Sequence, residues 1–134
     1  MSLSIDDLKE IFDKIIENLK NPESCGEYYN MELSIKKLAA SNSNTPSELL
    51  EKLANDGSNL VRGYVACNDN TPPEVLVKLA NDEYGNIRWM VANNPNTPPK
   101  VLKKLASDEW RVRHWVAKNP NTPVDTLKKL ADEG

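Results

Sequence analysis

Residues 87–105 read IRWMVANNPNTPPKVLKKL, and residues 112–130 read VRHWVAKNPNTPVDTLKKL. Asn-Thr-Pro occurs four times in the chain, and its threonines lie 26, 26 and 25 residues apart, at Thr45, Thr71, Thr97 and Thr122. A fixed period of this length is typical of solenoids, in which each unit buries its apolar face only against its neighbours. We therefore expect an all-α solenoid of about 25–26-residue helix-pair repeats without a β-sheet.

Each repeat contains two apolar stripes with helical spacing. In one copy the first stripe is Val75, Leu76, Leu79 and Ala80, and the second is Ile87, Met90, Val91 and Asn94. This spacing predicts two short helices that are separated by residues 81–86. The second segment is only about two turns long, which leaves a 3₁₀ conformation open for part of it. Trp115 and Tyr64 hold the position of Met90 in the neighbouring copies, so both are predicted to lie in the core.

The Asn-Thr-Pro phrase is typical of a helix start. We expect Thr71 to be the N-cap, Pro72 to occupy the first helical position and Glu74 to complete a capping box. The repeated asparagines, such as Asn94 and Asn96, are expected to bond to the backbone and to stack into a ladder.

The two ends of the chain differ from the repeats. Residues 1–30 carry a strong apolar stripe on a charged segment, which predicts an N-terminal amphipathic capping helix and a linker; docking to a partner is the alternative. Residues 31–134 are predicted to form the repeats. The last repeat has only its first half, with Leu127 and Leu130, and its open end favours either a continuation or a weak homodimer contact of an otherwise monomeric protein.

Composition restricts the class of protein. No apolar run approaches the roughly 20 residues of a membrane span, and residues 1–20 are too charged for a signal peptide. The two cysteines, Cys25 and Cys67, have no metal-binding spacing and fit a reducing, cytoplasmic location. The net charge is −3, but residues 1–85 carry 8 Lys/Arg against 15 Asp/Glu, whereas residues 86–118 carry 7 against 2. The two parts therefore present different surfaces to partners.

The combination Val-Arg-x-x-Val-Ala-x-Asn-Pro-Asn-Thr-Pro-x-x-x-Leu-x-x-Leu-Ala-x-Asp resembles the leucine-rich repeat variant family and, more distantly, HEAT repeats. The resemblance covers about residues 35–133. It implies a right-handed solenoid of paired helices, one of them 3₁₀ in some members, that serves as a binding scaffold. An iron–sulfur cluster is known in a member of the family, but Cys25 and Cys67 do not supply the roughly four ligands required. We therefore expect no cofactor.

Acidic and basic residues recur together at the turn between the two helices of a repeat. Five or six residues separate the members of each pair, which are Asp56/Arg62, Asp82/Arg88 and Asp108/Arg113. We expect salt bridges or Asp-to-backbone bonds that fix the turn and stack into a structural ladder. The alternative is a row of arginines that reads phosphates.

A candidate partner-binding face is predicted on the second helices. Trp89 and His114 hold one repeat position and are expected to point away from the core, and Lys118 lies on the same face. Trp110 and Arg111, in the turn, either extend this patch or cover the helix ends. Exposed tryptophans are enriched at binding hot spots, although packing along a neighbouring helix is the alternative.

The expected function is a non-enzymatic scaffold or protein–protein interaction module, because the chain has one histidine and no catalytic constellation. The alternative is a nucleic-acid-binding, HEAT-like module that uses the basic, tryptophan-rich residues 86–118. The acidic balance of the whole chain weakens that alternative.

Overall fold

The computed structural model describes residues 6–7, 10–11, 13–14 and 27–133. The described residues before position 27 are helical, but most of the predicted capping helix lies outside the described residues. Residues 27–133 form eight helices and no strand, in agreement with the predicted all-α class. They are α2 (Glu27–Ser41), α3 (Ser47–Leu53), α4 (Asn59–Cys67), α5 (Pro73–Leu79), α6 (Gly85–Asn93), α7 (Pro99–Leu105), α8 (Trp110–Lys118) and α9 (Val124–Glu133).

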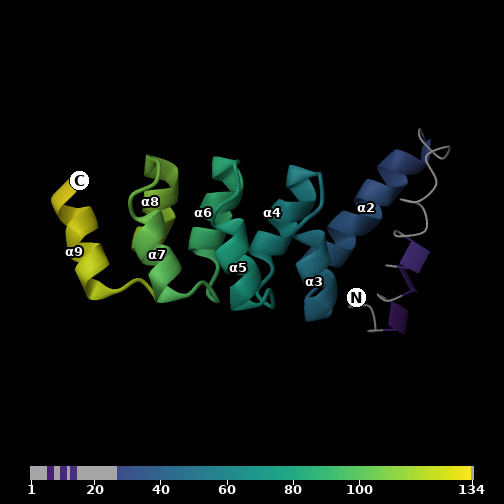
Figure 1. Ribbon diagram of the computed structural model, residues 1–134, viewed down its shortest axis with the longest axis horizontal. Coiled ribbons are helices and arrows are strands. Elements are labelled where there is room, and N and C mark those ends of the chain that lie inside the picture. The colour runs from purple at the N-terminus through teal and green to yellow at the C-terminus, as the bar shows by residue number, and fades with distance from the viewer. Residues whose placement is uncertain (1–5, 8–9, 12, 15–26, 134) are drawn as a thin grey trace.

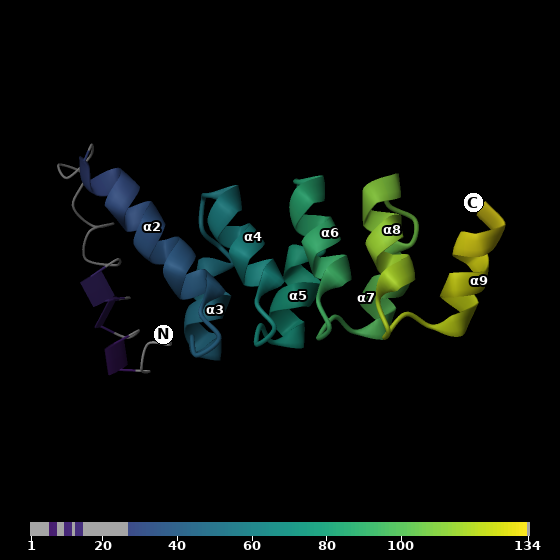
Figure 2. The ribbon, with the colours of Figure 1, turned by 180° about the vertical axis from the view of Figure 1, so that it is seen from behind.

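The helices stand side by side along one long axis, with α2 near one end and α9 at the other (Figures 1 and 2). Helices α2, α4, α6 and α8 pack against one another in sequence, and α3, α5 and α7 each pack against the helix that follows them. This arrangement is consistent with an α-solenoid. The predicted repeat boundary at residue 31 falls inside α2.

The second helices of the repeats are α-helical throughout. Helices α4, α6 and α8 have nine residues each, and α3, α5 and α7 have seven. A 3₁₀ conformation, which the sequence left open for the second helices, is thus not adopted there.

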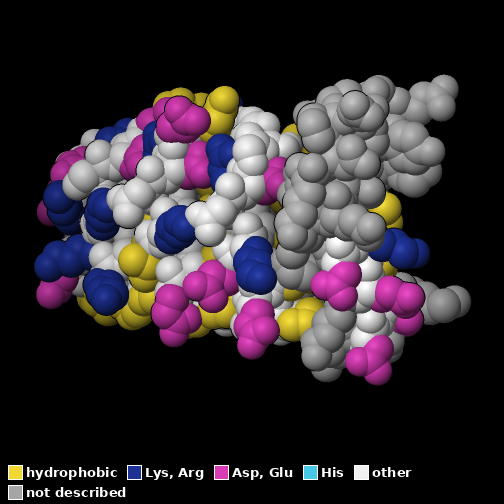
Figure 3. Space-filling model, turned by 45° about the vertical axis from the view of Figure 1, so that its right-hand side comes forward, with side chains coloured by type: hydrophobic (Ala, Val, Ile, Leu, Met, Phe, Trp, Pro, Cys, Tyr) yellow, Lys and Arg dark blue, Asp and Glu magenta, His cyan; other side chains and the backbone are white. Residues whose placement is uncertain are grey.

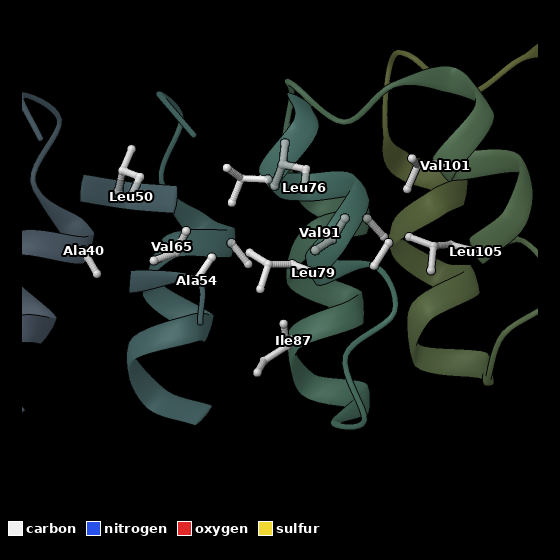
Figure 4. Packing of buried hydrophobic residues seen from close by; sticks show 14 of the residues in the cluster. Ala40, Leu50, Ala54, Val65, Leu76, Leu79, Ile87, Val91, Val101 and Leu105 are labelled. Carbon is white, nitrogen blue, oxygen red and sulfur yellow. The ribbon is translucent and has the colours of Figure 1, made fainter. Parts of the chain in front are cut away.

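The core is a row of apolar side chains between the two sets of helices (Figure 4). Leu50, Leu76 and Leu102 from the first helices are fully buried, as are Val65 and Val91 from the second helices. The same two repeat positions thus supply the core in each unit, because stacked units bury a continuous apolar stripe.

The predicted threonine cap is wrong. The N-cap of α5 is Pro72, the first helical residue is Pro73, and no side chain caps the helix. The hydroxyl of the buried Thr71 instead donates to the carbonyl oxygen of Val65, at 2.5 Å, near the end of α4. The Val65 carbonyl also accepts from the backbone N–H of Asn68, and the threonine hydroxyl adds a second bond in this last turn, so the side chain holds the preceding helix and does not start the next one. No capping box with Glu74 forms.

Thr97 and Thr122 make the same bond, to the carbonyl oxygens of Val91 and Val116. The tripeptide is therefore a connector whose threonine side chain ties the loop back to the helix before it. Proline in the extended conformation then sets the entry into the following helix.

The predicted asparagine ladder is confirmed. The Oδ1 atom of Asn94 accepts from the backbone N–H of Asn96, at 2.8 Å, and closes the turn. Its Nδ2 atom donates to the carbonyl oxygens of Ala66 and Asn68 in the preceding repeat, at 2.7 and 3.0 Å. Asn68 and Asn119 make equivalent bonds. Each buried asparagine therefore joins two neighbouring repeats.

Candidate partner-binding face

Helix α8 gathers three of the predicted partner-binding residues, Arg111, His114 and Lys118, on one side. Trp115, which was predicted to lie in the core, shares their helical face, because the four residues follow one another at spacings of three, one and three. Arg111, His114 and Lys118 are exposed, whereas Trp115 is half-buried and packs against the core.

Aromatic rings connect this face to α6. The Trp89 and Trp115 rings stack with their centroids 5.6 Å apart and an interplanar angle of 23°. His114 meets Trp115 edge-on at 5.4 Å, and the Lys118 ammonium lies 5.5 Å from the centre of the same ring. Trp115 is thus the centre of the group, with two aromatic neighbours and one cation.

Two predicted orientations are wrong. Trp89 does not point away from the core; it is half-buried and packs against it, because α8 lies beside α6 and Trp115 covers the indole. Tyr64 does not lie in the core, and 39% of its surface is exposed. A helical wheel treats one helix alone and cannot show which edge the next helix covers.

Trp110 and Arg111 lie in the first turn of α8 and not in the preceding turn, where the sequence placed them. Trp110 is 66% exposed, and the Arg111 guanidinium lies 5.4 Å from the centre of its ring. The pair therefore presents an accessible aromatic–cation surface at the start of α8.

A hollow opens on the same side of the molecule between α4 and α6. It has a volume of about 260 Å³ and is lined by Asn59, Leu60, Gly63, Tyr64, Cys67, Asn86, Ile87 and Met90. Gly63 holds the repeat position of Trp89 and His114. Because glycine has no side chain, the Met90 sulfur can approach closely, and a Cβ atom on Gly63 would lie 3.2 Å from that sulfur. The sequence showed this exception to the repeat but not the hollow beside it.

The recurring Asp and Arg residues form ion pairs between repeats. Arg62 Nε lies 2.8 Å from Asp82 Oδ2, and its Nη1 donates to the carbonyl oxygen of Asp56. Arg88 repeats this geometry with Asp108 and with the carbonyl oxygen of Asp82. The expected pairing inside one turn is therefore replaced by an Arg-to-backbone bond in the turn and an Arg-to-carboxylate bond to the next repeat.

The carboxylates also hold the turns, since Asp82 Oδ1 accepts from the Tyr84 backbone and Asp56 Oδ2 from the Ser58 backbone. At the N-terminal side, Lys36 pairs with Asp56 at 2.9 Å. Lys36 precedes Arg62 by 26 residues, so the repeat register could have identified it.

Arg113 differs from Arg62 and Arg88. It makes no such ion pair with any residue that the structure describes, because no further turn follows in the described chain. It lines a small hollow with His114, Ala117, Leu130 and Glu133 at the end of the helix row.

These ion pairs change the acidity of their members. Burial acts to raise the pKa of Asp82, but hydrogen bonds from the Arg62 side chain and the Tyr84 N–H, with the charges of Arg62 and Arg88, lower it below its usual value. The hydrogen bond to Asp82 raises the pKa of Arg62, and Asp108 does the same for Arg88. Both guanidinium groups are occupied by protein acceptors, which supports a structural role over phosphate reading.

The other Lys and Arg side chains of the basic segment 86–118 are divided between two helices. Lys100, Lys103 and Lys104 belong to α7, whereas Arg111 and Lys118 belong to α8. Figure 3 shows acidic side chains along the lower edge of one face, with basic side chains more frequent toward the left-hand, C-terminal end.

Other chemistry is limited in the described residues. They contain no group of three or more His, Cys, Asp or Glu side chains able to hold a metal ion. Cys67 is an exposed free thiol, and local burial together with the Asp69 charge raises its pKa. No helix in the described ranges is long and apolar enough to cross a bilayer.

Part of the chain is similar to a known protein family. Residues 86–132 match the Leucine Rich Repeat Variant domain, which confirms the resemblance noted in the sequence. The matched segment contains α7 and α8 and nearly all of α6 and α9. No match was found among curated proteins or among solved structures.

Proposed function

We propose that this chain, whose residues 86–132 match the Leucine Rich Repeat Variant domain, is a non-enzymatic protein-interaction module. Repeat solenoids present extended surfaces that suit protein partners. The proposed binding face consists of Trp89, Trp110, Arg111, His114 and Lys118, together with Trp115. The right-handed superhelix, the repeat of 25–26 residues, the cap formed by residues 1–30 and a cytoplasmic location belong to the same proposal.

The observation that carries the proposal is the Trp89–Trp115 stack with exposed polar groups around it. Trp115 contacts His114 and lies beneath Lys118, and Trp110 stands exposed beside Arg111. A partly covered aromatic centre with a polar rim is typical of binding hot spots.

Affinity capture with the full chain tests this face. We expect Arg111→Glu/Lys118→Glu to lose the partner that the wild-type chain retains, because the change reverses the charge of the rim without opening the core. Trp89→Ala is less suitable, since the indole also packs against the core.

Lys100→Glu/Lys103→Glu is the matched control, because it makes the same charge change at exposed positions of α7. Equal loss with both double variants, or unchanged recovery with Arg111→Glu/Lys118→Glu, contradicts the proposed face.

Nucleic-acid binding remains the second candidate, favoured by the seven Lys/Arg residues and three tryptophans in residues 86–118. The division of these cations between α7 and α8 and the pairing of Arg88 with Asp108 weaken it. A gel-shift assay at low and moderate salt tests it, because binding to phosphates falls steeply as salt rises. Absence of a salt-sensitive shift rejects this candidate.

A further inference from the structure

We infer that the partner is an extended acidic peptide segment with one bulky apolar side chain, and that this side chain enters the hollow between α4 and α6. The inference rests on the proposed function and extends its face from α8 and α6 to α4. It concerns the chemistry of the partner, which the proposed function leaves open.

The hollow adjoins the tryptophan stack. Asn86 and Met90, which line it, lie three residues before and one residue after Trp89 on α6. Asn86 is a neighbour of both Trp89 and Met90 on the helix surface, because residues three and four apart lie side by side. One ligand can therefore contact the hollow and the Trp89–Trp115 stack together.

The size of the hollow fits a single side chain. Its volume of about 260 Å³ lies just below the roughly 300 Å³ at which pockets for small molecules begin. Met90 contributes a flexible thioether to the wall, which can adjust to different apolar shapes. An apolar side chain of a peptide is therefore a better occupant than a complete small molecule.

The rim of the hollow is unusually apolar for a surface. Leu60 is 53% exposed and Tyr64 is 39% exposed, and both line the hollow from α4. Leu38, on the neighbouring α2, is 63% exposed. Adjacent exposed apolar side chains of this kind mark a contact surface more often than isolated ones do.

The charge on the α4, α6 and α8 side of the molecule favours a partner of negative charge. Helices α4, α6 and α8 contain no Asp or Glu. Their exposed side chains on this side are Leu60, Tyr64, Cys67, Asn86, Asn93, Arg111, His114 and Lys118, and Trp89, Met90 and Trp115 lie partly buried between them. Lys37 adds a cation at the other end, 5.8 Å from the centre of the Tyr64 ring. A chain of net charge −3 thus presents one row whose helical positions carry no carboxylate, with cations at both ends and Asp69 beside Cys67. This row complements an acidic segment and repels a basic one.

A peptide fits these observations better than a nucleic acid. Phosphates demand a continuous series of cations along the backbone, whereas the middle of this row is apolar. Arg62 and Arg88, which recur in every repeat, are already bound to Asp82 and Asp108. A peptide with an apolar side chain between acidic residues can place the apolar side chain in the middle of the row and its carboxylates near the cations at the two ends.

Selection from a displayed library of random peptides against the immobilised full chain tests the inference without a known partner. We expect the enriched peptides to be acidic and to share one bulky apolar residue. Replacing that residue by serine in a synthetic copy is expected to weaken binding about tenfold or more, since the anchor loses its burial in the hollow. Fluorescence anisotropy measures the affinity.

Leu60→Asp places a carboxylate on the rim of the hollow, and Leu60 lies in the first turn of α4, where an acidic residue suits the helix dipole. We expect it to abolish binding of the selected peptides. Val77→Asp is the matched control, because Val77 is an exposed apolar residue of α5, outside the row. Circular dichroism checks that both variants are folded, and Tyr64→Ala, which removes an aromatic wall without adding charge, replaces Leu60→Asp if that variant does not fold.

The outcomes separate the two proposals. Enrichment of basic or anchor-free peptides that still lose binding with Arg111→Glu/Lys118→Glu overturns the inference and supports the proposed face. Peptides that ignore both Leu60→Asp and Arg111→Glu/Lys118→Glu contradict both. Failure to enrich any peptide, or preference for an oligonucleotide of equal charge over the acidic peptides, overturns the inference, and affinity capture then decides the proposed function alone.

Discussion

At the residue scale, the buried Asn94 side chain makes three hydrogen bonds that no apolar side chain at this position could make. Its buried amide closes one turn through Asn96 and reaches the carbonyl oxygens of Ala66 and Asn68. We expect Asn94→Ala to lower the free energy of unfolding by about 2–4 kcal/mol, because buried partners are left unsatisfied. Urea denaturation measures the change.

Asn93→Ala is the control for this prediction. Asn93 is exposed on the same helix, and its replacement is expected to change stability by less than about 0.5 kcal/mol. Similar losses for both variants would show that the asparagine ladder adds little to stability.

Gly63 offers a second test at a single residue. Alanine removes the conformational freedom of glycine within α4, which stabilises a helix by roughly 0.5–1 kcal/mol. The new methyl group would lie 3.2 Å from the Met90 sulfur, at the flexible end of that side chain. We expect Gly63→Ala to raise the thermal midpoint slightly. A lower midpoint would show that Met90 is fixed in place.

The sequence predicted residue types better than their contacts. The repeated asparagine was correctly predicted to bond to the backbone, but Thr71 was predicted to cap the helix after it, and its acceptor lies in the helix before it. A hydroxyl next to two helix ends can satisfy either, and the sequence does not show which end it reaches.

At the element scale, the Arg62–Asp82 pair links α4 to the turn before α6. Their side chains are only 12% and 8% exposed, so solvent screens the interaction less than at an open surface. We expect Asp82→Asn to lower the free energy of unfolding at pH 7 by about 1–3 kcal/mol, since charged hydrogen bonds are lost. Chemical denaturation at a series of pH values measures it.

The pH dependence of this loss has a defined sign. The folded-state pKa of Asp82 lies below the value of about 3.9 for an unfolded aspartate. Its contribution is therefore complete above that value and disappears as the pH falls through the folded-state pKa. We expect the gap between wild type and Asp82→Asn to close in acid. Asp69→Asn, at an exposed position, should show a much smaller gap, and a gap that persists in acid would exclude the charge as its cause.

The helix pairs themselves were predictable, because each unit repeats the same apolar spacing. The candidate face was only partly predictable. The helical wheel correctly placed His114 and Lys118 on the outside, but it placed Trp89 outside and Tyr64 in the core, which is wrong. Exposure at the edge of a helix depends on the side chain opposite it in the next repeat. Trp89 faces Trp115 and is covered, whereas Tyr64 borders the hollow beside Gly63.

At the scale of the whole molecule, burial depends on whether another repeat follows. Leu102 in α7 is fully buried, and Leu127, its equivalent in α9, is 37% exposed. Val124 is 66% exposed and Leu130 is half-buried at the same end. The repeated sequence is thus nearly constant while its environment changes along the axis, because each unit is covered by the next one.

This difference predicts the effect of one substitution at two places. We expect Leu102→Ala to cost about 2–5 kcal/mol, as for other buried leucines, and Leu127→Ala to cost less than about 1 kcal/mol in dilute solution. If a second copy covers α9, as in the weak homodimer that we propose as the alternative to a monomer, the cost of Leu127→Ala grows with protein concentration, because association adds stability by mass action. Thermal melts over a wide concentration range measure both effects. A concentration-independent cost for Leu127→Ala contradicts a dimer through α9, and equal costs at the two positions would mean that this end is covered from within the chain.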